Sequence, residues 1–264
     1  MILLRKQQRI PHRKTVKKLK VAGMDLSQKT DSLVGHLSEL RKRLIIILVV
    51  NITATFICYF FIDKLIQYIL YLNPGMNLIY IAPSELFMVY MELALICAIV
   101  LCFPITISEI WMFISKGLYK KERNHVLLSL FFGAFFFVAG ILFCYTIALP
   151  ITLDFFMRIS LEEVTANISV KSFVSFCNTM LISFGIVFEL PVIVFLLSEL
   201  DILKPSFMKK SYGVLVLIIF IVAAIITPPD VISQIVMAIP MLVLLEISKG
   251  ICYFVDKRKK SGHK

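Results

Sequence analysis

The sequence predicts an all-α membrane protein with six transmembrane helices, the last two of them short, and with both termini in the cytoplasm. Three observations carry this prediction. The chain of 264 residues is 59% hydrophobic and only 17% charged, whereas a soluble domain is close to half apolar. Six long apolar segments follow a polar amino-terminal region. Lysine and arginine gather in alternate connecting segments, as the positive-inside rule requires.

The chain divides by composition into three regions. Residues 1–30 are basic and have few side chains that could form a core, so we expect a disordered cytoplasmic tail. This region lacks the short apolar core of a cleavable signal peptide. Residues 31–255 are expected to form the transmembrane domain, and residues 256–264 a second basic cytoplasmic tail.

The apolar segments differ in length. The first four have 19 or more residues, enough to cross roughly 30 Å of hydrocarbon. The last two have 15 and 17 residues and reach only roughly 22 and 26 Å. A tight turn at 227–230 joins them into a hairpin, which we expect to span a locally thinned bilayer; a re-entrant loop is the alternative. The six predicted spans are 44–62, 86–107, 126–149, 172–198, 212–226 and 231–247.

The orientation follows from the basic residues. Of the 28 lysines and arginines, 25 fall in the segments that an amino terminus inside the cell would place in the cytoplasm. Only Lys64, Arg158 and Lys171 fall outside. The formal net charge of +11 therefore indicates cytoplasmic loops near anionic lipid, and no nucleic-acid partner is expected.

A carboxylate stands among cations where the first span begins, in the stretch HLSELRKRL. On a helix, His36, Glu39 and Arg43 share one face, and Arg41 lies at the edge of the adjacent apolar stripe. The simplest interpretation is an i,i+4 ion pair of Glu39 with Arg43, worth only about 0.2–0.5 kcal/mol. The alternative is an anionic site for a cationic ligand.

The second basic loop repeats this pattern. Glu122 lies among Lys and Arg, and Trp111 and Phe113 precede it. An interfacial aromatic belt with positive-inside charges would explain these residues. They would equally suit a cytoplasmic surface that binds guanidinium groups beside an apolar side chain.

Polar residues also occur inside or close to the spans. Glu189 lies within an apolar segment just before Pro191, and Glu92 lies within the second span. A charge at this depth costs at least about 2.5–3.5 kcal/mol, so such residues are by default functional. Pro191 is expected to kink its helix.

The turn of the hairpin is polar too. Thr227, Asp230 and Gln234 lie at its outer end. Turn formation and helix capping account for Asp230, whereas a side chain such as Gln234 can bond to another helix.

Four stretches resemble, in order, the signature motifs of the twin-arginine translocase receptor subunit family, TatC. They are HLSELRKRL, WMFISKGLYKKER, FGIVFELPV and TPPDVISQ. PSELFMVYM and the span that ends at Ala148-Leu149-Pro150 match as well. The resemblance covers roughly residues 33–255. It departs from the family pattern at Glu92, where many relatives have lysine, and in the long basic tail.

The resemblance implies a receptor that binds the diarginine signal peptides of folded export substrates. Glu39 and Glu122 would receive the arginines, with His36, Arg41, Arg43, Trp111 and Phe113 around them. Glu189 would be the family's intramembrane glutamate on a concave, water-accessible face. Thr227, Asp230 and Gln234 would dock small single-span partners of the TatA or TatB type. An oligomeric complex in the bacterial cytoplasmic membrane is implied, without catalytic residues, cofactor or metal.

Two other functions compete with this one. A small proton- or ion-coupled transporter could use the two intramembrane glutamates as a relay, but the spans show no convincing inverted repeat. An intramembrane enzyme would need a nucleophile with its base, or metal ligands, and no such motif occurs.

The six cysteines lie in or beside apolar runs without C-x-x-C spacing, which favours a role in packing. Because no nucleotide-binding loop is present, the membrane potential or proton gradient is the expected energy source.

Overall fold

The structure is a computed structural model that describes residues 37–72, 75, 77–115, 123–159, 167–227 and 231–262. It divides into two compact units, Met1–Ile46 and Ile47–Lys264, and each is described by itself. In the described part, six helices are long and apolar enough to cross a membrane, which confirms the predicted fold class. They are Leu37–Tyr59, Pro83–Phe113, Leu128–Arg158, Val170–Glu199, Pro205–Ile226 and Gln234–Ser261.

The connection after the first helix has structure of its own. The chain turns at Phe60 and Phe61 and enters α2, Ile62–Leu70, which buries Ile62, Ile66 and Ile69 on one face. Strand β1, Asn77–Ile79, then pairs in parallel with β2, Asn167–Ser169. The hydropathy pattern anticipated neither α2 nor this pair of strands.

The second and third spans run past their predicted limits. Helix α3 covers Pro83–Ser115. Helix α4, Arg123–Phe143, passes through a π-helical segment, Cys144–Ala148, into α5, Leu149–Ile159. The π-helical segment ends two residues before Pro150, which has no N–H to donate to the preceding turn, so the wider helix accommodates it.

The fourth span is broken near its middle. Helix α6, Val170–Val187, ends before Glu189, and α7, Leu190–Glu199, begins with Pro191 in its first turn. The kink predicted from Pro191 is therefore confirmed. Within the apolar 18-residue window of this span, 56% is buried inside the protein, against 6% for the first span. It is the central element, in contact with α3, α4 and α9.

The last two helices extend beyond their apolar runs. Helix α8, Pro205–Ile226, has 22 residues and α9, Val231–Gly262, has 32. Helix α9 thus includes most of the basic segment expected to be a tail. The predicted short length applies to the segment of each helix that crosses the hydrocarbon of the bilayer. That length stays a prediction.

Two glycines bring α4 and α6 close together. A Cβ on Gly140 would stand 2.6 Å from the carbonyl oxygen of Phe184, and one on Gly185 would stand 2.7 Å from the ring of Phe137. Small residues allow such close contact between membrane helices.

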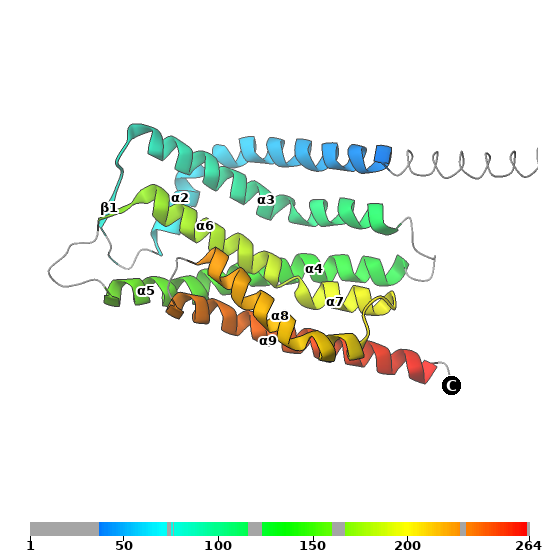
Figure 1. The fold of residues 1–264 in the computed structure, drawn as a ribbon. Coiled ribbons are helices and arrows are strands. Elements are labelled where there is room, and N and C mark those ends of the chain that lie inside the picture. Colours follow the sequence, from blue (N-terminus) through cyan, green and yellow to red (C-terminus); the bar gives the residue numbers. More distant parts are fainter. Residues whose placement is uncertain are drawn as a thin grey trace, which may run out of the picture. The chain divides into compact units, whose positions relative to one another are not determined.

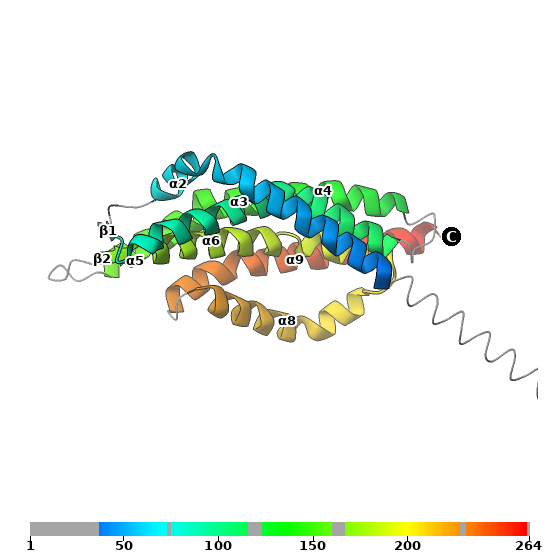
Figure 2. The same ribbon diagram turned by 90° about the horizontal axis from the view of Figure 1, so that it is seen from above.

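Within the unit that begins at Ile47, the two strands lie at one end of the helices and the carboxyl end of α9 lies at the other (Figures 1 and 2).

Candidate functional site

The first candidate residues lie on the amino-terminal turns of the first helix. Arg43 donates to Glu39 Oε1 from Nη2 at 3.1 Å and from Nε at 3.2 Å, which confirms the i,i+4 pair. Each of the two side chains is only 17% exposed. Partial shielding from water strengthens this ion pair relative to a fully exposed one. Arg41 is exposed, and His36 lies outside the described residues.

The aromatic candidates lie near the end of α3. Trp111 is partly buried and packs against Val192 and Leu196 of α7, so it already has a structural role. Phe113 is partly buried as well. Glu122, the second carboxylate of the predicted site, lies outside the described residues.

Glu189 is buried between two helices. It occupies the position just before α7 and is 5% exposed, which corrects the expectation of a water-accessible face. Its Oε1 has no hydrogen-bond partner among the described residues. A Cβ on Gly133 of α4 would stand 3.1 Å from Oε2, so the carboxylate fills the space that this glycine leaves.

Glu92 has its own partners on α6. Ser175 Oγ donates to Glu92 Oε2 at 2.6 Å, and Asn178 Nδ2 donates to Oε1 at 3.2 Å. Asn178 is 1% exposed and its Oδ1 is unpaired in the described part of the chain. Asn178, which binds Glu92, lies roughly 16 Å before Glu189 along the same span. Glu92 and Glu189 therefore belong to separate sites. Neither partner on α6 was predicted from the sequence.

The polar residues of the hairpin are bonded within it. Thr227 is buried, and its Oγ1 donates to Ala223 O at 2.9 Å. Gln234 Nε2 donates across to Phe220 O of α8 at 3.0 Å. Gln234 does bond to another helix, as predicted from its type, and that helix belongs to its own chain. Asp230 lies outside the described residues.

A further buried carboxylate, Glu85, was not among the predicted site residues. Its Oε2 accepts from the backbone N–H of Ile81 at 2.7 Å, and its Oε1 accepts from Lys171 N at 3.2 Å and from the Ser169 hydroxyl. One side chain thus ties the start of α3 to the junction of β2 and α6. The local signal was present in the sequence: proline at the first helical position and glutamate at the third are typical of a helix start.

Comparison with known proteins gives consistent matches. The family model described as Sec-independent protein translocase protein (TatC) matches residues 35–240. The Sec-independent protein translocase protein TatC of Helicobacter pylori strain J99 is 36% identical over 232 residues, or 88% of this chain and 93% of that protein. The TatC of Carboxydothermus hydrogenoformans is 35% identical over 242 residues, or 90% and 100%. A crystal structure titled twin arginine translocase receptor TatC matches with a TM-score of 0.75 at 30% identity, covering 84% of this chain and 99% of that one.

Proposed function

The chain belongs to the TatC family of Sec-independent protein translocase proteins, and from that premise we propose that it is the subunit that receives diarginine signal peptides. As a TatC protein it is a component of the Tat translocase, a multi-pass membrane protein without enzymatic activity. The proposal adds the ligand, the residues that bind it and the partner subunits.

The Glu39–Arg43 pair is the observation that carries the proposal. Glu39 is held by Arg43 and is largely shielded, at the start of a membrane span. A carboxylate has room for about four hydrogen bonds, so it can share a second guanidinium. Arginine matches it with a planar fork of donors, whereas lysine offers a point charge. Arg43 would then orient the carboxylate, and the second arginine of the signal would pair with Glu122.

The remaining predicted residues take supporting roles in this proposal. His36 and Arg41 would border the site, and Trp111 and Phe113 would contact the apolar part of the signal peptide. Glu92 and Glu189 would serve later steps within the membrane.

Partner docking is proposed for the α8–α9 hairpin. Gln234 uses its Nε2 within the chain, and among the described residues nothing donates to its Oε1. A hydrogen-bond donor near the start of a TatA- or TatB-type helix could reach that oxygen, and Thr227 and Asp230 would contribute to docking. Such bonds between membrane helices contribute about 0.6 kcal/mol on average, so docking would also need packing. An oligomeric complex in the bacterial cytoplasmic membrane, with both termini cytoplasmic, completes the proposal.

The test is binding of a labelled signal peptide to the purified protein in nanodiscs. Peptides with Arg-Arg and with Lys-Lys are compared on the wild type and on the Glu39→Gln and Glu122→Gln variants. Loss of a charge-assisted hydrogen bond costs about 1.5–3 kcal/mol, so each variant should bind the Arg-Arg peptide roughly ten- to a hundredfold more weakly.

Asp256→Asn is the matched control. Asp256 is paired with Lys260 at 2.6 Å and belongs to no proposed site, so this variant should bind like the wild type. Equal binding of the two peptides, unaffected by either glutamate substitution, would leave Glu39 with a structural role only and contradict the receptor function.

A further inference from the structure

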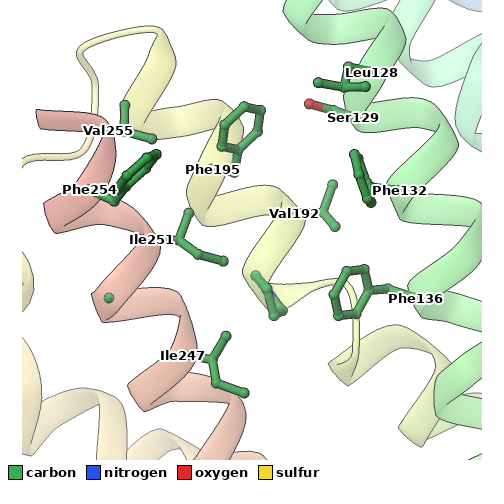
Figure 3. Close-up of a pocket in the computed structure, with 12 residues that line it drawn as sticks. Leu128, Ser129, Phe132, Phe136, Val192, Phe195, Ile247, Ile251, Phe254 and Val255 are labelled. Atoms are coloured by element: carbon green, nitrogen blue, oxygen red, sulfur yellow. The ribbon is translucent and has the colours of Figure 1, made fainter. Parts of the chain in front are cut away.

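An apolar groove runs between α4, α7 and α9. Its volume is about 560 Å³, within the usual range for ligand pockets. Figure 3 shows side chains from the three helices facing one space, with Phe132 and Phe136 on α4, Val192 on α7, and Ile251 and Phe254 on α9. The lining is almost entirely hydrocarbon, so the occupant must be apolar where it enters the groove.

The groove is open to the surroundings of the protein along its edges. Leu128 and Phe132 on one side and Ile247 and Phe254 on the other are exposed. All four lie in helices that are long and apolar enough to span the membrane. Hydrocarbon chains of lipid therefore have direct access to the groove.

Cations lie at the end of this groove. Phe254 lines both the groove and a basic pocket formed with Lys257, Arg258 and Ser261. These four residues share one face of α9 because they are three and four positions apart. Arg258 pairs with Glu199 yet remains 49% exposed, and within the described part of the chain no carboxylate pairs with Lys257. The pocket therefore offers one oriented guanidinium and one uncompensated ammonium.

More cations flank the groove on its other side. Gly250 lines both the groove and a second pocket, which Lys209, Tyr212, Lys249 and Tyr253 help to form. Lys249 lies over the Tyr212 ring at 4.7 Å and pairs with Glu246 at 2.5 Å. Lys209 meets no carboxylate among the described residues. This end of the helices has surplus positive charge beside an apolar groove.

We propose that the groove and its basic end form a binding site for one anionic phospholipid. An acyl chain occupies the space between α4, α7 and α9, and the phosphate lies against Lys257 and Arg258. Basic pockets between membrane helices bind lipid head groups in this way, and the stem of a lysine follows apolar surface while its head reaches the phosphate. A transmembrane helix about 10–12 Å wide, rising 5.4 Å per turn, would fit the groove for about one turn only, which favours the lipid.

The chain contains its own probe for this site. Its single tryptophan, Trp111, packs against Val192 together with Phe136 and Phe195, and all three of these residues line the groove. A bromine-labelled acyl chain that enters the groove should therefore quench the fluorescence of Trp111. Nanodiscs of zwitterionic phosphatidylcholine would carry a small fraction of either brominated phosphatidylglycerol or brominated phosphatidylcholine.

In the wild type we expect the anionic brominated lipid to quench Trp111 at several-fold lower mole fraction than the zwitterionic one. Lys257→Gln should weaken this preference about fivefold, the effect of about one cation near the membrane surface. Gly250→Leu should reduce quenching by both lipids, because its side chain would fill the groove. A Cβ at Gly250 meets no atom within 4 Å, so the helix should tolerate the change. Lys210→Gln removes a cation from α8 that lines none of these pockets and should leave the preference unchanged.

Three results would overturn the proposal. Equal quenching by the two lipids in the wild type would exclude selection of an anionic head group. A preference that survives both Lys257→Gln and Gly250→Leu would assign it to the basic surface in general. A Trp111 signal that responds only to an added single-span peptide would assign the groove to a protein helix.

Discussion

The carboxylate of Glu189 lies directly against the backbone of Gly133. A Cβ placed on that glycine would stand 3.1 Å from Oε2 and 3.5 Å from Oε1. Glycine at this position therefore supplies the space for a buried carboxylate between α4 and the start of α7. The two residues are 56 positions apart in the sequence, and they should act as a unit.

Gly133→Ala should destabilise the protein, because the carboxylate must move within a packed interior, at a cost of about 1–3 kcal/mol that the higher helix propensity of alanine offsets by roughly 0.5–1 kcal/mol. Thermal unfolding in nanodiscs measures the change. Gly213→Ala is the control: no atom lies within 4 Å of its Cβ, so alanine should be neutral or stabilise α8 by roughly 0.5–1 kcal/mol. In a Glu189→Ala background the cost of Gly133→Ala should largely disappear. An equal cost in both backgrounds would show that the two residues are not coupled.

Gly140→Ala should be more harmful than Gly133→Ala. Its Cβ would stand 2.6 Å from the Phe184 carbonyl oxygen and 2.8 Å from Phe188 Cβ, and backbone yields less easily than a carboxylate. The α4–α6 contact would have to open, at a cost at or above the roughly 1–3 kcal/mol of ordinary overpacking. Size-exclusion chromatography of the two purified variants should give a lower folded yield for Gly140→Ala. A yield equal to that of Gly133→Ala would contradict this ranking.

Glu85→Gln should loosen the end of the protein where β1 and β2 lie. The carboxylate accepts hydrogen bonds from Ile81 N, Lys171 N and Ser169, and an amide offers one oxygen in place of two. We expect a loss of about 1–3 kcal/mol, with faster hydrogen exchange at the amides of Ile81 and Lys171. Ser169→Ala removes one of these bonds and also the cap that Ser169 Oγ provides to Ser172 N at the start of α6, so it should destabilise the protein as well but leave exchange at Ile81 unchanged. Unchanged exchange in Glu85→Gln would mean that β1 and β2 are held by other contacts.

The features predicted correctly are those with local signals. Six apolar runs follow from composition, the break before α7 follows from Pro191, and the Glu39–Arg43 pair follows from i,i+4 spacing. Two missed features, α2 and the capping carboxylate Glu85, did have local signals, whereas the others depend on residues far apart in sequence. Hydropathy cannot report the pairing of β1 with β2 or the contact of Gly133 with Glu189, because each is fixed by how the helices pack.

The same distinction explains the accessibility of Glu189. Its type and depth indicated an intramembrane functional residue, and the expectation of an open face came from a family resemblance. In this chain Gly133 allows α4 to cover the carboxylate. Whether a side chain at a given depth is covered depends on its neighbour across the helix interface, which no local pattern contains.

The Glu92 site permits a test in which removing a second group restores stability. Glu92→Leu would leave the hydroxyl of Ser175 and the amide of Asn178 without their acceptor. Hydrogen bonds between membrane helices contribute on average about 0.6 kcal/mol and at most about 1.7, so we expect a loss of about 1 kcal/mol in thermal unfolding. Glu92→Gln should cost less, since its oxygen can accept from Asn178 and its amide can donate.

Adding Asn178→Leu to Glu92→Leu should recover most of that loss, because removing both partners of a buried hydrogen bond costs less than removing one. Asn178 is suited to this replacement since it is 1% exposed and its Oδ1 has no partner in the described part of the chain. Asn178→Leu alone should be close to neutral or mildly destabilising, because Ser175 would still donate to Glu92. If the double variant were less stable than Glu92→Leu, Asn178 would contribute through packing that leucine does not reproduce.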